Sequence, residues 1–333
     1  MKKFQVVGIG NAMVDVLARA DDSFLAQAGI EKGIMQLIDM DRAVELYGLI
    51  GPAREVSGGS AANTIAGIAH LGGRTAYVGK VKDDQLGVIF AHDMRAQGAV
   101  YETAFAPKDA VDETGRCLVI VTPDGERSMN TYLGVTEFLT VDDIDEAQMA
   151  QAEWIYLEGY RFDGPESHAA FAKAIAACKA AGGRVSLTLS DPFCVSRHRE
   201  AFRAMIRDDV DLLFCNRAEM LSMYETDDFD AALAMAAAEV AVVACTDSAN
   251  GAYVLAGSQR WHVPADPVQI VDATGAGDLF AGAFLWALAE NYSLPDCGRI
   301  GNIAAGEVIG HIGARPEQDL KGLIAKAGVV PAT

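Results

Sequence analysis

The second half of the chain repeats one pattern, in which a short apolar run is followed by a longer segment with apolar residues at helical spacing. The short runs predict strands over 154–157, 184–189, 211–215 and 240–245. The longer segments predict helices over 167–181, 198–206, 218–224, 230–238, 278–290 and 299–309, and residues 251–263 predict a hairpin. Strands that alternate with helices indicate a parallel sheet with helices on both faces.

The first half begins in the same way and then departs from this pattern. Its regular elements are a predicted strand over 4–9, a loop and helix over 57–73, a strand over 75–81 and a helix over 87–97. By contrast, residues 116–122 and 127–132 flank the turn Pro123-Asp124-Gly125 and predict a β-hairpin. This hairpin and the segment 13–50 do not fit the alternation, so we expect a small β appendage on an α/β core.

The charge of the chain narrows the class of partner. Lysine and arginine number 27 against 46 aspartates and glutamates, which gives a net charge of −19. Such an acidic body repels phosphate backbones and anionic lipid heads, so we expect neither nucleic acid nor a membrane surface as partner. A small anionic ligand is still possible, because helix N-termini and one or two cations can hold a phosphate locally.

Cysteine usage and hydropathy point to a cytoplasmic protein. The six cysteines sit singly, with no CxxC and no zinc-like spacing, which fits buried thiols in a reducing compartment. No run approaches the ~18 apolar residues of a transmembrane helix. We interpret the N-terminal residues as a first strand and not as a signal peptide.

The most informative stretch is 271–284, where a turn of small residues opens directly into an apolar helix. Gly275, Ala276 and Gly277 let a ligand approach the backbone closely, and their N–H groups would point out of a helix N-terminus that favours anions. Asp278 follows at the helix start, where a carboxylate can accept the proton of an attacking hydroxyl. On its own, Asp278 would more simply be an N-cap.

Two further segments combine residues suited to sugar hydroxyls. In Ser57-Gly58-Gly59-Ser60-Ala61-Ala62-Asn63, two glycines precede a helix, and Asn63 offers both a donor and an acceptor. Asp15, with Asn11 nearby, lies in an apolar context where a carboxylate without a partner is costly, and ligand hydroxyls would satisfy it. The simpler interpretations are an ordinary helix start and a solvated turn aspartate.

Asn216 and Glu219 follow the predicted strand that ends at Cys215. The carboxyl end of a strand is where α/β proteins bind ligands, and a hydrated Mg²⁺ takes oxygen ligands of this kind. A capped helix start explains the same two residues equally well. Familiar alternatives fail on spacing: Gly8-Ile9-Gly10 lacks the third glycine of a dinucleotide-binding fingerprint, and Gly73 to Lys80 departs from P-loop spacing.

Taken in order, these four segments resemble the ribokinase-like (PfkB) family of sugar and nucleoside kinases over nearly the whole chain. One departure is Ala273, where the family usually has Thr or Ser. The resemblance implies a doubly wound α/β fold with a β-sheet lid, and transfer of the γ-phosphate of ATP to a primary hydroxyl. It implies a core of residues 1–12, 52–108 and 140–333 and a discontinuous lid of residues 13–51 and 109–139.

The resemblance also implies roles for single residues. Asp278 corresponds to the catalytic base, and Gly275, Ala276 and Gly277 correspond to the anion hole. Residues implied to contact the acceptor sugar are Asn11, Asp15, Gly58, Gly59, Ser60, Asn63 and Thr274. Residues implied to hold ATP and Mg²⁺ are Asn216, Glu219 (through water), Thr246, Ser248 in place of the usual glycine, Gly251, Asn302 and Ala305. Asp272, with the backbone near Val308 and Gly313, corresponds to a monovalent-cation loop that usually holds K⁺.

Within the family, the adenosine kinases look most similar in several segments. Tyr160 and Phe193 fall where aromatic residues meet the nucleoside base, and Met35, Leu37, Met129 and Thr131 fall where the lid lines the base pocket. The resemblance therefore implies adenosine as acceptor, with a sugar such as ribose or fructose as the alternative. A non-catalytic nucleoside-binding protein and a nicotinamide-dependent oxidoreductase are rival classes. The oligomeric state, monomer or homodimer, stays open.

Overall fold

Nine strands form the core sheet in a computed structural model that describes residues 2–331. In spatial order they are β14 (Gln259–Val263), β13 (Ala252–Ala256), β12 (Val242–Thr246), β11 (Leu212–Asn216), β10 (Arg184–Thr188), β9 (Ala152–Glu158), β1 (Phe4–Ile9), β5 (Thr75–Val78) and β6 (Val100–Tyr101). All neighbours are parallel except the pairs that involve β13. This arrangement confirms the predicted, mostly parallel sheet.

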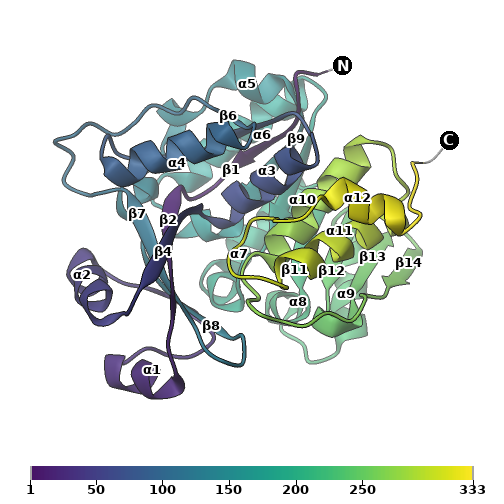
Figure 1. Cartoon of the computed structure of the whole chain (residues 1–333). Coiled ribbons are helices and arrows are strands. Elements are labelled where there is room, and N and C mark those ends of the chain that lie inside the picture. The colour runs from purple at the N-terminus through teal and green to yellow at the C-terminus, as the bar shows by residue number, and fades with distance from the viewer. Residues whose placement is uncertain (1, 332–333) are drawn as a thin grey trace.

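Helices cover both faces of the core sheet (Figure 1). One face packs on α5 (Glu146–Ala150), α6 (Ser167–Ala180), α7 (Pro192–Asp208), α8 (Arg217–Tyr224) and α9 (Phe229–Glu239). The other packs on α3 (Ser60–His70), α4 (Gln85–Ala96), α10 (Ala276–Ala289), α11 (Leu294–Val308) and α12 (Leu320–Lys326). The doubly wound fold class is confirmed. Short 3-10 helices are η1 (Gly134–Phe138), η2 (Val141–Asp143), η3 (Gly159–Asp163) and η4 (Ser248–Asn250).

A second, five-stranded sheet projects from the core (Figure 1). Its spatial order is β3 (Met35–Leu37), β8 (Arg127–Tyr132), β7 (Gly115–Val121), β2 (Met13–Arg19) and β4 (Ala53–Gly58). The predicted hairpin is confirmed, because β7 and β8 pair antiparallel. The predicted division differs at β4: residues 53–58 were expected in the core, yet they pair antiparallel with β2.

The two faces of the second sheet have different neighbours because side chains alternate along a strand. On one face Val16, Ala18 and Leu118 pack on α1 (Asp22–Ala28) and α2 (Met40–Leu49), two helices that the sequence pattern did not predict. The opposite face carries Met13, Leu17, Cys117, Val119 and Val121, together with Asp15. This second face is turned toward the core.

Capping residues explain where several helices begin earlier than the periodicity predicts. Asp191 accepts hydrogen bonds from the N–H groups of Phe193 and Cys194, so α7 starts at Pro192 instead of 198 and bends at His198. The Ser293 hydroxyl is the N-cap of α11 and accepts a hydrogen bond from the N–H of Asp296, so this helix starts at Leu294 instead of 299. Among residues 2–331, no helix has the length and apolar character needed to cross a bilayer.

Candidate active site

A cavity of about 710 Å³ lies between the second sheet and the carboxyl edge of the core sheet. The strand order reverses between β1 and β9, and such a switch point opens a crevice at the strand ends. Asn11, Glu158, Ser190, Asn216 and Thr246 come from or directly follow successive strands and all line this cavity. The N-terminus of α10 closes one side, with Gly275, Ala276, Gly277 and Asp278 in its wall.

Asp278 is held by two side chains of α3. Ser60 Oγ donates to its Oδ1 at 2.7 Å, and Asn63 Nδ2 donates to its Oδ2 at 2.9 Å. Burial raises the pKa of Asp278, while these two hydrogen bonds and the charges of Arg127 and Arg315 oppose the rise. The structure therefore joins the two segments that the sequence singled out separately, and it gives the carboxylate a fixed orientation. A simple N-cap is not observed, because Gly275 holds that position.

The turn before α10 needs small residues for two reasons. Gly275 has a φ of 79°, and a Cβ there would lie 2.5 Å from the Cβ of Ala314. At Gly277, in contrast, no other part of residues 2–331, apart from the adjoining backbone of α10, comes within 4 Å of the place where a Cβ would stand. The backbone at Gly277 thus opens into the cavity at a helix N-terminus, where free N–H groups favour an anion.

Asp15 faces the cavity from β2 and is only 7% exposed. Burial raises its pKa to about 7, although Arg315 counteracts this effect. Gly58 lies so close that an added Cβ would meet the carboxyl group at 2.1 Å, so the carboxylate rests on the β4 backbone. Gly58 itself is not part of the cavity wall, whereas its neighbour Gly59 is. Asp15 is therefore a buried carboxylic acid whose side chain faces the cavity.

The beginning of α3 offers one more polar group. Asn63 is 3% exposed, and its Oδ1 is buried with no hydrogen-bond partner within residues 2–331. A buried polar atom without a partner is costly, so Asn63 fits a position that a ligand hydroxyl completes.

Glu158 lines the cavity, and the sequence analysis missed it as a site residue. Its carboxylate accepts hydrogen bonds from the N–H groups of Asn11 at 3.2 Å and Ala61 at 2.8 Å. Burial raises its pKa to about 7, which those two hydrogen bonds moderate. A signal was available, since Glu158 ends an apolar strand run as Asn216 does.

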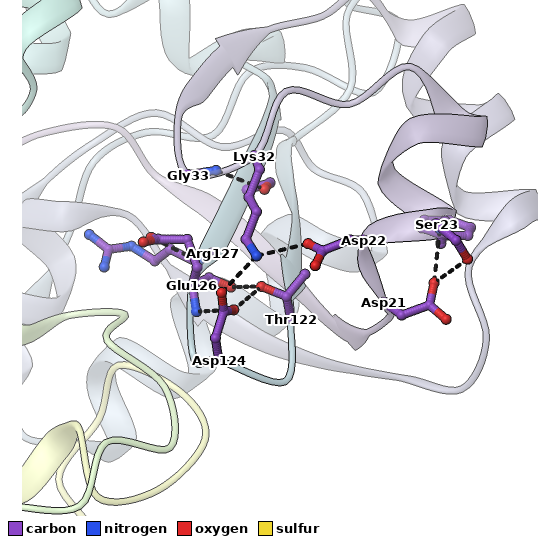
Figure 2. Close-up of polar contacts among 11 residues, drawn as sticks. Asp21, Asp22, Ser23, Lys32, Gly33, Thr122, Asp124, Glu126 and Arg127 are labelled. Atoms are coloured by element: carbon purple, nitrogen blue, oxygen red, sulfur yellow. Dashed lines mark hydrogen bonds and ion pairs between the residues drawn. The ribbon is translucent and has the colours of Figure 1, made fainter.

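Arg127 of β8 is a second residue that the sequence analysis missed. It lines the cavity, and its Nη1 donates to the carbonyl of Ala273 at 2.9 Å, just before the glycine turn. Figure 2 shows its side chain directed away from the ion pairs that Lys32 makes with Asp22 and Asp124. Arg127 thus places a positive charge from the second sheet next to the turn that precedes α10.

The second sheet supplies an apolar wall to the cavity. The predicted residues Met35, Leu37, Met129 and Thr131 all line it, and so do Met13, Cys117, Val119 and Leu133. Tyr160 also lines it, and the phenol donates to the carbonyl of Ser190 at 3.2 Å. The structure does not bring Phe193 to the cavity: this residue is in the first turn of α7 and is 47% exposed.

The predicted nucleotide residues gather at the other end of the cavity. Asn216, Glu219, Thr246, Ser248, Gly251, Asn302 and Ala305 all line it. Ser248 has a φ of 49°, a left-handed conformation that glycine adopts more easily. Asn302 Nδ2 donates to the carbonyls of Val263 and Pro264, at 2.9 and 3.2 Å, and so braces the loop after β14.

Asn216 and Glu219 form a reciprocal capping box at the start of α8. Glu219 N–H donates to Asn216 Oδ1 at 2.9 Å, and the backbone N–H of Asn216 donates to Glu219 Oε2 at 2.9 Å. Helix capping therefore explains part of the arrangement of these two side chains. Burial nevertheless raises the pKa of Glu219 to about 7, and the residue lines the cavity. Carboxylate oxygens accept more than one bond, so the donor set also fits a hydrated Mg²⁺.

Asp272 lies behind the glycine turn and outside the cavity wall. It is fully buried, and its oxygens accept hydrogen bonds from the Thr274 hydroxyl at 2.6 Å and the Gly313 N–H at 2.9 Å. Thr274 itself lines the cavity. The carbonyl of Ile309, next to Val308, accepts from the N–H groups of Val271 and Asp272. The contacts of the Asp272 carboxylate are thus with N–H and O–H donors of Thr274 and Gly313, which fix the loop behind the glycine turn.

Comparisons with known proteins agree with this geometry. The family model described as "pfkB family carbohydrate kinase" matches residues 33–320. A crystal structure described as adenosine kinase from Sinorhizobium meliloti is 48% identical, with a TM-score of 0.94 and coverage of 98% of this chain and 99% of that one. A "probable sugar kinase protein" from Rhizobium etli CFN 42 is 47% identical, with a TM-score of 0.96 and coverage of 99% and 100%.

A curated relative is less similar and covers less of the chain. It is a fructokinase from Vibrio alginolyticus, 28% identical over 70% of this chain and 77% of its own length. The relatives thus include enzymes named for a nucleoside and enzymes named for a sugar.

Proposed function

Because the chain belongs to the pfkB family of carbohydrate kinases, we propose that it transfers the γ-phosphoryl group of ATP to the 5′-hydroxyl of adenosine, giving AMP and ADP. Family membership makes the protein a phosphotransferase that acts on an alcohol group, and it implies ATP with Mg²⁺. The choice of adenosine as acceptor rests on the cavity wall.

The observation that carries this choice is the apolar lining contributed by the second sheet. Met35, Leu37, Met129 and Leu133 face the same cavity as Asp15. A sugar alone satisfies the carboxylate but leaves these side chains uncovered, and a purine base covers them. Tyr160 adds an aromatic side chain on the same side. The 48% identity to the Sinorhizobium meliloti enzyme supports the same choice.

In this proposal the ribose is held by Asn11, Asp15, Gly59 and Asn63, with the 5′-hydroxyl beside Asp278. Asp278 accepts the hydroxyl proton as the oxygen attacks the γ-phosphorus. The N–H groups of residues 275–277 and the guanidinium of Arg127 stabilise the charge that spreads over the phosphoryl oxygens. Arg127 also bonds to the carbonyl of Ala273, so the second sheet, acting as a lid, contributes this charge to the site.

The nucleotide and cation roles belong to the same proposal. Thr246, Ser248, Gly251, Asn302 and Ala305 line the region assigned to ATP, and Glu219 would reach Mg²⁺ through water. Bound Mg²⁺ supplies charge neutralisation on the phosphates. K⁺ would be held by Asp272 and the carbonyls near Val308 and Gly313. There it would influence the conformation of the glycine turn without contact with the substrate. A cytoplasmic location is also proposed, and the six buried free cysteines support it.

The test is ADP release in the presence of Mg²⁺-ATP and one acceptor at a time. Adenosine should give the highest kcat/KM, and 5′-deoxyadenosine, which lacks the attacked hydroxyl, should inhibit without turnover. Preferential turnover of ribose or fructose would establish the sugar-kinase alternative. Adenosine binding with no ADP release from any acceptor would instead favour a non-catalytic binding protein.

A further inference from the structure

Arg161 is a buried cation behind the cavity wall, next to Asn11, and the proposed chemistry does not use it. It lies in η3, directly after β9, and only 1% of it is exposed. Its Nη1 donates to Asn11 Oδ1 at 3.0 Å and to the carbonyl of Thr136. Its Nη2 donates to the Ser167 hydroxyl at 2.7 Å and to the carbonyl of Leu139 at 3.5 Å. One guanidinium thus joins four segments of the chain.

The contact with Asn11 fixes the orientation of that amide. A guanidinium only donates hydrogen bonds, so the atom of Asn11 that faces Arg161 must be the carbonyl oxygen. The amide nitrogen of Asn11 then points the other way, and Asn11 is part of the cavity wall. Its backbone N–H is also fixed, at 3.2 Å from Glu158 Oε1. The side chain of Asn11 therefore turns its N–H groups, and not its carbonyl oxygen, toward the part of the cavity assigned to the phosphoryl acceptor.

The contacts with Thr136 and Leu139 connect this amide to the second sheet. Two of the places where the chain crosses between the core and that sheet are just after Asn11, at the start of β2, and at the end of β8, shortly before Thr136. The N–H of Ala12 donates to the Thr136 hydroxyl at 2.9 Å, so the two crossings touch directly. Arg161 spans both crossings from the core side.

We propose that Arg161 is a positioning residue, which orients the Asn11 amide toward an acceptor hydroxyl and ties it to the point where the second sheet joins the core. The inference rests on the proposed function, because it assigns Asn11 to acceptor binding in that reaction. Arg161 itself touches neither substrate. Its loss should weaken acceptor binding and leave ATP binding unchanged.

A double-mutant cycle separates this role from a purely structural one. Arg161→Gln and Asn11→Ala should each raise the KM for the acceptor about tenfold, the effect of losing one well-placed hydrogen bond. In the Asn11→Ala background, Arg161→Gln should raise that KM by less than about twofold, since the amide it orients is gone. The KM for ATP should stay constant throughout. Equal effects of Arg161→Gln in both backgrounds would overturn the proposal.

Two further variants guard against loss of folding. Asn11→Asp keeps an oxygen for Arg161 but removes the donors, so it should raise the acceptor KM as much as Asn11→Ala does; normal binding would contradict the assigned orientation. Ser167→Ala removes another Arg161 contact that does not involve Asn11, and it should leave the KM unchanged. The unaltered enzyme tests the proposed function separately: if it phosphorylates only another acceptor, that proposal fails and the cycle is run with that acceptor.

Discussion

The hydroxyl of Ser60 donates to Oδ1 of Asp278 at 2.7 Å and joins two helix N-termini that are 218 residues apart in the chain. With Asn63 on the other oxygen, the carboxylate is held from one side, and its remaining lone pairs are available to a ligand. A raised pKa and a fixed orientation are what a general base requires.

Asp278→Asn should lower kcat by ~10²–10⁴, the usual contribution of a general base. The amide has nearly the same shape, so the melting temperature and the affinity for adenosine should change little. Steady-state kinetics together with calorimetric titration of adenosine measures both. Near-full activity in this variant would mean that another group accepts the proton.

Gly275 and Gly277 form a matched pair because only the first has neighbours. Gly275→Ala should lower the melting temperature, since its Cβ would clash with Ala314 and the φ of 79° disfavours a side chain. Gly277→Ala should leave stability intact, because within the described chain only the adjoining backbone lies within 4 Å of the added Cβ. It should still lower kcat/KM for ATP at least ~10-fold, because a methyl group would occupy space assigned to the phosphates. Full activity of Gly277→Ala would place the anion site elsewhere.

Asp15 should make the fold less stable at neutral pH than at mildly acidic pH. Its pKa is raised by burial to about 7, so the folded protein holds this proton more tightly than the unfolded chain does. The corresponding loss of stability develops as pH rises from about 4 to about 7 and is complete above 7. Asp15→Asn should therefore melt a few degrees higher than the unaltered protein at pH 8, and the difference should shrink at pH 5.

The same variant should bind adenosine at least ~10-fold more weakly at pH 8, because a charged acceptor of ribose hydroxyls is lost. Scanning calorimetry at the two pH values measures the first effect, and titration of adenosine measures the second. A stability difference that does not depend on pH would show that Asp15 is not the buried acid described here.

Substitutions of Arg127 and Lys32 distinguish the effect on activity of a positive charge near the start of α10 from the effect of positive charge elsewhere on the second sheet. Arg127→Gln should lower kcat by ~10-fold or more, because the cation faces the developing phosphoryl charge and bonds to the carbonyl of Ala273. Lys32→Gln removes a cation from the same end of this sheet, where its ion pairs are solvent-exposed, and should leave kcat unchanged. Equal losses in both variants would indicate a nonspecific effect of charge.

The sequence predicted the parts of the fold whose signal is local. The regular alternation after residue 154 predicted the core, and the small residues before Asp278 predicted the turn that opens into α10. Helix starts were missed where a cap, Asp191 or Ser293, is followed by a proline at the first or second helical position, because proline is also typical of turns. The helices α1 and α2, which pack on the second sheet, are short. Their apolar residues are too few to distinguish a helix from a strand within the segment 13–50, for which only β structure was predicted.

The residues missed at the site depend on contacts between distant segments. Nothing in the sequence near Arg127 indicates that its side chain reaches Ala273, 146 residues away. Strand β4 was assigned to the core because its pairing with β2 is set by the tertiary fold. Phe193 was expected at the base, but the cap at Asp191 starts a helix there and turns this side chain toward solvent.

In the proposed reaction, the protein binds a nucleoside in this cavity and phosphorylates its 5′-hydroxyl. The most direct measurement is a competition in one reaction that contains adenosine, ribose and fructose at equal concentration with Mg²⁺-ATP, and mass spectrometry of the products. We expect AMP to form first and in large excess over any sugar phosphate. A sugar phosphate that forms ahead of AMP would contradict this proposal.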